Sequence, residues 1–268
     1  MQLPRTLPPK EMRAKIRSGE WQGPTAGCCD GYVQANLVAL PKALAYDFLL
    51  FCHRNPKPCP LLEVTDPGDV EPRITAPGAD LRTDLPKYRV YRSGELEDEV
   101  TDLFEVWRED LVSFLLGCSF TFDVALQRAG VPVRYLDEGR NVSMYVTNRS
   151  CRPAGIFAGP LVVSMRPIPA SLIPRAVEVT ARFPLAHGAP VHVADPPVIG
   201  IFDLNRPDFG DPVSIHPGEQ PVFWACGVTP QAVAMHAKPE IMITHAPGHM
   251  FITDLASDNG SGLSEVHG

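Results

Sequence analysis

The amino-acid sequence predicts an α/β protein whose sheet mixes parallel and antiparallel strands and is flanked by helices. Apolar, strand-like runs alternate with segments of helical period along most of the chain. The runs VHV (191–193), GIF (200–202) and FWAC (223–226) follow one another too closely to leave room for crossover helices. Some neighbouring strands must therefore be antiparallel, and a purely parallel sheet is excluded.

The first half of the chain is expected to begin with a short amphipathic helix. A second helix has apolar residues on nearly every side, and the proline-rich segment 55–60 ends it because proline cannot continue a helix. A Gly/Pro/Asp-rich loop separates the two strands that follow. The elements expected in this half are helices at 8–20 and 42–53, strands at 61–65 and 87–92, and helices at 106–116 and 120–128 joined by a turn at 117–119.

The second half is expected to be richer in strands. Pro174 is tolerable only in the first turn of one helix, and Thr229 caps another helix that has Pro230 at its first position. The elements expected in this half are strands at 141–147, 161–165, 189–193, 198–202, 221–226, 240–244 and 249–253, and helices at 172–183 and from 229 onward.

The composition predicts a folded protein with rigid loops. The 29 prolines among 268 residues are interleaved with dense apolar runs, which a disordered chain would lack. We expect one catalytic unit over residues 1–255, built as a single body or as two interlocked subdomains. A flexible tail is expected over residues 256–268.

Charge and cysteine content narrow the class of partner. The chain has 24 Lys+Arg against 31 Asp+Glu, a net charge of −7 without a basic cluster, which argues against nucleic acid. No apolar stretch reaches the roughly 20 residues that cross a membrane. Seven scattered cysteines without a CxxC pair indicate reduced thiols in a cytoplasmic protein and no Cys-rich zinc site. A small carboxylate or amino acid is the expected partner. The sequence allows either a monomer or a homo-oligomer.

Polar side chains of catalytic type recur where predicted strands end. Arg166 follows the strand 161–165 and could grip a carboxylate through its fork of donors, or form a salt bridge at the sheet rim. His187 and His192, with Asp195 nearby, could be a base and its orienting group, metal ligands, or structural histidines. His245, followed by His249 and Asp254, offers a second such set, but its geometry is poor for zinc and no metal is predicted.

Two predicted strand-to-helix connections, called joints below, carry a cysteine just before the helix. At Cys226–Gly227–Val228–Thr229, unpaired backbone N–H groups favour a bound anion and could form an oxyanion hole. The alternative is a capped helix with a buried cysteine. Gly117–Cys118–Ser119 poses the same choice before another helix.

Several motifs together resemble a known family. GCSF (117–120), VVSMRP (162–167), HGAPVH (187–192) and FWACGVTPQ (223–231) are similar, in order, to a hydro-lyase family that includes D-glutamate cyclase, and the match runs from about residue 11 to residue 255. The resemblance implies an α/β fold with two interlocked lobes. It also implies conversion of D-glutamate to 5-oxo-D-proline and water, with no cofactor.

Fitting the residues to that reaction gives a candidate site. His192 is expected to be the base, with His187 or His245 as the acid. Alternative functions are a hydro-lyase or amide-ring hydrolase for another small carboxylate, with or without metal assistance, or a non-enzymatic module that binds small acids. The expected catalytic residues are His187, His192, Asp195 and His245, and the expected substrate-binding residues are Arg166, Ser164, Ser119, Cys226, Gly227 and Thr229.

Overall fold

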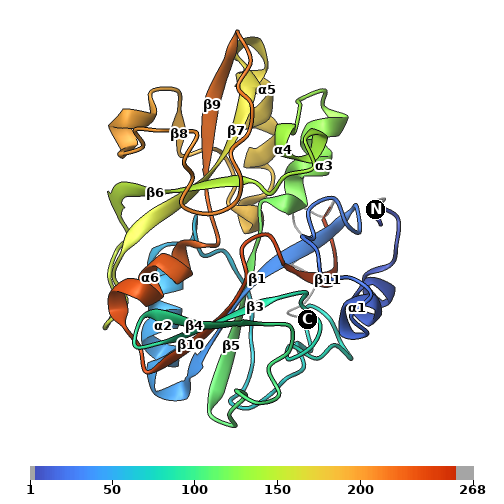
Figure 1. Cartoon of the computed structure of the whole chain (residues 1–268), viewed down its shortest axis with the longest axis vertical. Coiled ribbons are helices and arrows are strands. Elements are labelled where there is room, and N and C mark those ends of the chain that lie inside the picture. The colour runs from blue at the N-terminus through green and yellow to red at the C-terminus, as the bar shows by residue number, and fades with distance from the viewer. Residues whose placement is uncertain (1–3, 258–268) are drawn as a thin grey trace.

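The computed structural model describes residues 4–257, which form two antiparallel sheets with helices packed against them (Figure 1). The elements, in chain order, are α1 (Pro9–Arg17), β1 (Tyr32–Pro41), α2 (Lys42–Arg54), β2 (Leu61–Val64), β3 (Tyr88–Arg92), β4 (Glu95–Val100), β5 (Leu111–Gly117), α3 (Phe120–Arg128), α4 (Arg134–Asp137), β6 (Ser143–Ser150), β7 (Pro160–Pro169), η1 (Ala170–Leu172), α5 (Ile173–Ala181), η2 (Pro184–Ala186), β8 (His192–Val193), η3 (Pro196–Ile199), β9 (Glu219–Ala225), α6 (Thr229–Ala237), β10 (Ile241–His245) and β11 (Phe251–Ala256). The seven-stranded sheet has the order β2-β5-β1-β10-β3-β4 with β11 also on β1, and the four-stranded sheet has the order β6-β7-β9-β8.

Strand β1 is the centre of the larger sheet, and it is buried on both faces from residue 34 to residue 41. Val38 pairs with Phe114 of β5 on one side and with Thr244 of β10 on the other. On one face, Phe48 of α2 packs edge-on against Phe114 with ring centroids 4.8 Å apart. Leu37 belongs to the cluster on the opposite face. Because both faces are covered, the sequence of β1 is almost continuously apolar.

The parallel part of the predicted sheet is wrong. Every strand pairing within residues 4–257 is antiparallel, which confirms the prediction that closely spaced strands are antiparallel. The helix α2 does not return the chain to a neighbour of β1, because the strand after it, β2, pairs with β5. The candidate residues therefore do not share the carboxyl edge of a parallel sheet.

Two predicted elements are replaced by other structures. Residues 106–116 were expected to be helical, but Leu111–Gly117 is strand β5, buried at all seven positions. This run is apolar at nearly every position, so it has no period that separates a helix from a buried strand. Residues 198–202 were expected to be a strand, but Pro196–Ile199 is a 3-10 turn that ends at Gly200 with φ 83°.

The other differences concern edges and lengths. Strand β4 was not predicted, because its residues, ELEDEV, are mostly acidic and exposed and lack apolar alternation. The expected strand at 189–193 is reduced to the two residues of β8. The remaining predicted helices and strands are confirmed with small shifts at their ends. Strand β11 extends to residue 256, and the predicted tail from residue 258 onward lies outside the described residues.

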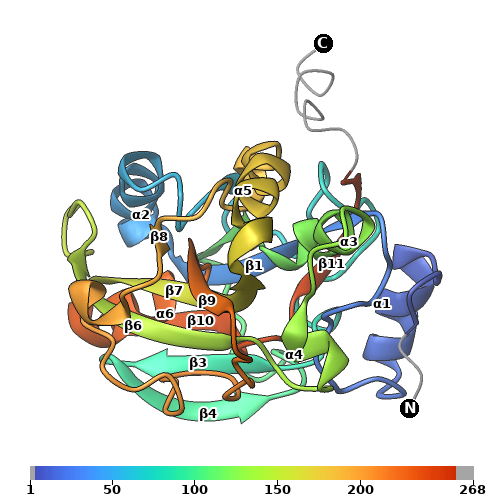
Figure 2. The same ribbon diagram turned by 90° about the horizontal axis from the view of Figure 1, so that it is seen from above.

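Helix α2 packs on β1 and β5 of the larger sheet, and α6 packs on β7 of the smaller one. Figure 2 shows α2 and α5 on one side of the molecule and β3 and β4 on the opposite side. No helix in the described part of the chain is long and apolar enough to cross a membrane.

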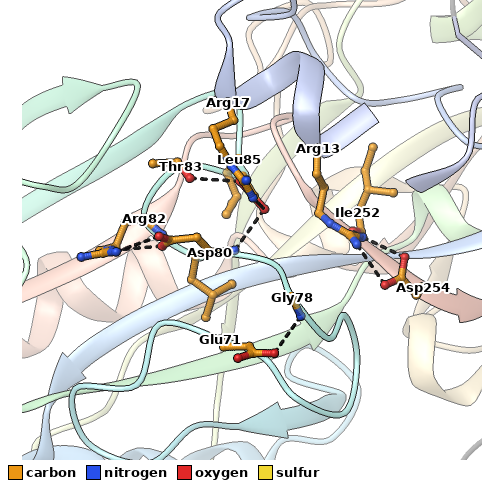
Figure 3. Close-up of polar contacts among 12 residues, drawn as sticks. Arg13, Arg17, Glu71, Gly78, Asp80, Arg82, Thr83, Leu85, Ile252 and Asp254 are labelled. Atoms are coloured by element: carbon orange, nitrogen blue, oxygen red, sulfur yellow. Dashed lines mark hydrogen bonds and ion pairs between the residues drawn. The ribbon is translucent and has the colours of Figure 1, made fainter. Parts of the chain in front are cut away.

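Helix α1 is fastened to the larger sheet by two arginines, and Figure 3 shows both. Arg13 forms an ion pair with Asp254 of β11 at 2.9 Å. Arg17 pairs at 2.7 Å with Asp84, whose side chain is fully buried in the loop before β3. Asp84 also accepts the backbone N–H of Asp80 at 3.0 Å, so the loop and the helix are held as one unit.

Gly117, at the end of β5, is a position where a close approach requires glycine. A Cβ built there would lie 1.6 Å from the carbonyl oxygen of Leu185. We expect Gly117→Ala to lower the free energy of unfolding by about 3 kcal/mol, because backbone on both sides must shift. Chemical denaturation measures this, with Gly23→Ala as control, since a Cβ there meets only Trp21 at 3.8 Å. Equal stability of the two variants would contradict this packing.

Candidate functional site

A buried ion pair between Arg166 of β7 and Asp123 of α3 is the centre of the candidate site. Arg166 is 0% exposed and Asp123 is 3% exposed. Nε of Arg166 donates to Oδ1 of Asp123 at 2.9 Å, and Nη2 lies 2.9 Å from the same oxygen. The hydroxyl of Tyr135 donates to Oδ2 of Asp123. Burial raises the pKa of the Asp123 carboxyl, and the charge of Arg166 opposes that shift.

Two serine hydroxyls complete the partners of this guanidinium. Nη2 of Arg166 donates to Oγ of Ser119 at 3.1 Å, and Nη1 donates to Oγ of Ser164 at 3.3 Å. Each hydroxyl oxygen is used as an acceptor here, so each hydroxyl keeps its own proton to donate to a ligand. The guanidinium carbon also lies 5.0–5.5 Å from the ring centroids of Phe122, Tyr135 and Trp224. Arg166, Ser164 and Ser119, all expected from the sequence, are thus brought together.

The two cysteine-bearing joints also meet, at the side chain of Asn36. Nδ2 of Asn36 donates to the carbonyl oxygen of Gly117 at 2.8 Å. A Cβ on Gly227 would lie 2.0 Å from the same nitrogen, so only glycine fits against this amide. The joint before α3 and the joint before α6 therefore touch one side chain of β1, although 110 residues separate Gly117 from Gly227.

The thiols of Cys118 and Cys226 lie in the core cluster that contains this site. Cys118 accepts the backbone N–H of Phe120, and Cys226 accepts that of Val228, so each thiol faces the first turn of a helix. Burial raises the pKa of both thiols, that of Cys226 to about 11. The N–H groups and the charge of Arg166 act in the opposite direction.

The hydroxyl group of Thr229 is hydrogen-bonded to the backbone of two different segments. Its hydroxyl donates to the carbonyl oxygen of Cys226 at 2.7 Å and accepts the backbone N–H of Val162 at 3.1 Å. These two bonds fasten the start of α6 to β7 and fix the direction in which the joint after β9 turns.

His187 presents an unpaired nitrogen inside the protein. Its Nδ1 lies 2.6 Å from the carbonyl oxygen of Lys57, which can only accept, so the proton is on Nδ1. Nε2 is buried and has no hydrogen-bond partner among the described residues. Burial, the charge of Arg166 and the charge of Lys57 lower the pKa of His187 to about 4. The ring is therefore neutral at pH 7, with a free lone pair on Nε2.

The loop that carries His187 is held close to the joint before α3. His187 has φ 75°, an uncommon backbone conformation for a residue with a side chain. The ammonium of Lys57 donates to the carbonyl oxygen of Ala189 at 2.7 Å. Lys57 thus holds both His187 and the residues after it, while Leu185 packs against Gly117.

His245 lies at the end of β10 and also has a buried, unpaired Nε2. Its Nδ1 lies 3.3 Å from both the backbone nitrogen and the carbonyl oxygen of Leu37. Its own carbonyl oxygen accepts from Nε2 of Gln231 in α6 at 2.8 Å. Burial, with smaller contributions from the nearby His249 and Arg89, lowers the pKa of His245 to about 3. No hydrogen bond among the described contacts links His245 to His187.

His192 and Asp195 lie nearer the surface. His192 is partly exposed and Asp195 is exposed. Nε2 of His192 bonds to the backbone carbonyl oxygen of Asp195 at 3.0 Å, not to its carboxylate. Neither residue has a described hydrogen bond to Arg166, Ser119 or Ser164.

Four residues of this region were not singled out in the sequence: Asn36, Lys57, Asp123 and Tyr135. Asp123 carried a usable signal, because a lone acid within the apolar run FTFDVAL must find a partner when it is buried. Asn36 lies in an equally apolar segment, where a buried amide must also find a hydrogen-bond partner. Lys57 and Tyr135 carried no signal, since their roles depend on contacts distant in sequence.

The described residues contain no group of three or more His, Cys, Asp or Glu side chains placed to hold a metal ion. The set His245, His249 and Asp254 is not assembled, because Asp254 binds Arg13. A separate cavity of about 380 Å³ lies between α1 and the loops that flank β3 and β4. It is lined by none of the candidate residues.

A family model described as D-glutamate cyclase matches residues 112–254. The chain belongs to the D-glutamate cyclase family. The matched segment includes both cysteine-bearing joints, the Arg166–Asp123 pair, His187 and His245. Asn36 and Lys57 lie before it.

Relatives match over nearly the whole chain. Proteins named "Putative hydro-lyase" from Stutzerimonas stutzeri and Geobacillus kaustophilus are 63% and 66% identical, over 95% and 93% of this chain and 96% and 95% of theirs. One from Bacillus subtilis is 60% identical over 94% of this chain and 98% of its own. A solved structure of a nitrogen repressor-like protein from Methanococcus jannaschii covers 87% of this chain and 90% of its own at 10% identity, and its TM-score of 0.37 is too low to inform fold or function.

The two buried neutral histidines predict acid-sensitive folding. In the unfolded chain a histidine binds a proton below about pH 6.5, whereas folded His187 and His245 stay neutral down to about pH 4 and pH 3. Stability is therefore complete above pH 6.5 and falls by about 1.4 kcal/mol per pH unit and per histidine below it. Denaturation between pH 7 and pH 5 measures the slope. His187→Gln should reduce the slope by about 1.4 kcal/mol per pH unit, and His216→Gln, an exposed control, should leave the slope unchanged.

The buried pair predicts a large cost when one partner is removed. Asp123→Asn leaves the Arg166 charge uncompensated, so we expect a loss of about 3–5 kcal/mol in the free energy of unfolding. Exposed Asp195→Asn should change it by less than about 0.5 kcal/mol. The double variant Asp123→Asn/Arg166→Met, which removes both charges, should recover part of the loss. Additive losses in the double variant would contradict a coupled pair.

Proposed function

We infer that this protein is a hydro-lyase that closes D-glutamate into 5-oxo-D-proline and releases water. The observation that carries the proposal is the buried, unpaired Nε2 of His187 near Arg166, whose guanidinium also orders two hydroxyl groups. A bound amino acid would supply the missing partners: its ammonium would donate to the unpaired base, and its carboxylate would accept from the hydroxyl groups. Membership of the D-glutamate cyclase family supports the same substrate class.

Arg166 acts on the substrate through the serines in this proposal. Its Nε, Nη2 and Nη1 donate to Asp123, Ser119 and Ser164, and Nη2 also lies 2.9 Å from Asp123. A direct bidentate contact with a substrate carboxylate would therefore require a rearrangement. The hydroxyl protons of Ser119 and Ser164, polarised by the guanidinium, are the donors available to a substrate carboxylate.

Lactam formation then needs proton transfers that neutral His187 is suited to make. The substrate ammonium carries three protons and the product amide keeps one, so two protons must reach the departing oxygen, which leaves as water. Nε2 accepts one ammonium proton before the C–N bond forms and passes it to that oxygen. After the bond has formed, Nε2 takes the second proton from the nitrogen and passes it to the same oxygen, which leaves as water. The backbone N–H groups of Ser119 and Gly227 have no hydrogen-bond partner among the described contacts, and they would stabilise the oxyanion of the tetrahedral intermediate. The reaction needs no redox cofactor and no ATP.

The roles expected for His192, Asp195 and His245 remain part of the proposal as alternatives. If His192 is the base, as the strand-end pattern suggests, the loop 187–195 must bring its partly exposed ring to the substrate. If His245 is the acid, its unpaired Nε2 must face the γ-carboxyl group. Single variants of the three histidines separate these assignments.

Turnover of purified protein tests the function. We expect 5-oxoproline from D-glutamate, detected by chiral chromatography, and less from L-glutamate. His187→Gln should lower kcat by about 10²–10⁴-fold, the usual contribution of a positioned base. Ser119→Ala should raise KM. Thermal denaturation checks that each variant folds, and His216→Gln serves as the matched surface control.

Two outcomes would overturn parts of this assignment. If His192→Gln abolishes turnover while His187→Gln does not, the base is His192. If neither enantiomer of glutamate yields 5-oxoproline, the proposed reaction is wrong, and loss of water from other small carboxylates is the next reaction to assay.

A further inference from the structure

The cavity between α1 and the loops that flank β3 and β4, called the α1 cavity below, is separate from the candidate site. Its volume of about 380 Å³ is typical of pockets that hold small molecules. Three segments line it: the end of α1 with the residues that follow (16–22), the loop before β3 (78–86) and the connection after β4 (101–104). A ligand bound here would share no residue with the proposed reaction.

Two arginines of the α1 cavity each keep one nitrogen unused. Nε and Nη2 of Arg17 donate to the carboxylate of Asp84 at 2.8 Å and 2.7 Å. Nε and Nη2 of Arg82 donate to the carboxylate of Asp80 at 3.0 Å and 2.8 Å, and Figure 3 shows these contacts. Nη1 of either guanidinium has no hydrogen-bond partner among the described contacts. The carboxylates thus hold both guanidiniums in place and leave one end of each free to donate to a ligand.

Asp102 brings the opposite charge to the same cavity. Its Oδ1 accepts the backbone N–H of Phe104 at 3.2 Å, and the exposed side chain forms no ion pair within residues 4–257. Asp80 and Asp84 already balance the two guanidiniums, so Asp102 leaves the cavity with an excess negative charge. A simple anion would be repelled, and a simple cation would leave the two Nη1 groups without an acceptor. A ligand that carries both charges satisfies both requirements.

Phe104 gives the α1 cavity an apolar wall. It is 58% exposed, and the guanidinium carbon of Arg82 lies 5.1 Å from its ring centroid. Ile16 and Pro86 add buried apolar residues from the other two segments. An apolar group of a ligand that covered this wall would remove apolar surface from water, which is favourable.

We propose that the α1 cavity is a second, non-catalytic binding site for an α-amino acid with an apolar side chain. The ligand carboxylate accepts from Nη1 of Arg17 and of Arg82, and the ammonium pairs with Asp102. The side chain packs against Phe104. Glutamate is excluded, because its second carboxylate would meet the excess negative charge of the cavity.

Binding of phenylalanine tests the proposal. We expect at least one of its enantiomers to bind in isothermal titration calorimetry and to raise the Tm, because a ligand that binds only the folded state stabilises it. Three compounds should bind about 10-fold more weakly or worse, since each loses one contact or adds a repulsion. They are 3-phenylpropionate, which lacks the ammonium, phenethylamine, which lacks the carboxylate, and D-glutamate.

Two variants of exposed residues locate the site. Asp102→Asn keeps an oxygen for the backbone N–H of Phe104 but removes the charge, and Phe104→Ala removes the apolar wall. Each should raise the Kd for phenylalanine about 10-fold or more, whereas Asp102→Glu should retain binding. The matched controls are Asp98→Asn, whose Oδ1 likewise accepts a neighbouring backbone N–H, and Phe202→Ala, 85% exposed and outside the cavity. Thermal denaturation without ligand checks that every variant folds.

The outcomes separate this proposal from the proposed function. Absence of binding by both enantiomers overturns the amino-acid site, and so does binding that is unchanged in both Asp102→Asn and Phe104→Ala. Binding that is lost in Ser119→Ala but kept in Asp102→Asn assigns the ligand to the Arg166 site and also overturns it. None of these results affects the cyclase proposal, which depends on formation of 5-oxoproline.

Discussion

The fully buried guanidinium of Arg166 is the constraint on which the rest of this structure depends. A charge in an apolar interior is tolerated only when it is paired and its donors are used. Asp123, Ser119 and Ser164 meet that requirement, and Phe122, Tyr135 and Trp224 enclose the group. Because these partners come from α3, α4, β7 and β9, satisfying one charge fixes the arrangement of four elements.

The need to pair the buried charge of Arg166 also shapes the chemical properties of the candidate site. Arranging hydroxyl groups around the guanidinium leaves their protons available. Burial, together with the positive charge of Arg166, lowers the pKa of His187 and keeps its ring neutral. The backbone of His187 is held in a left-handed conformation by Lys57 and by the contact of Leu185 with Gly117. A group that is strained, buried and unpartnered persists only where the surrounding structure over-determines it, as at binding and catalytic sites.

The high proline content has a local explanation in part of the chain. Pro184, Pro196 and Pro197 start the two 3-10 turns of the segment that carries His187, His192 and Asp195. His187, Ala194 and Asp195 all have positive φ in this segment. Proline reduces the freedom of the unfolded chain, which offsets part of the cost of holding such conformations.

The sequence by itself determined the family, the antiparallel character of the closely spaced strands and most helices. It also singled out Arg166, Ser164 and Ser119, whose side chains are hydrogen-bonded to one another in the structure. These features depend on short stretches of the sequence: motifs, turn residues and the period of apolar residues. Only the tertiary structure decided that β5 is a strand, that Asp123 neutralises Arg166, that Asn36 joins two distant joints, and that His187 rather than His192 lies buried beside the charge. These outcomes depend on burial and on partners far apart in the chain, and no local pattern encodes either.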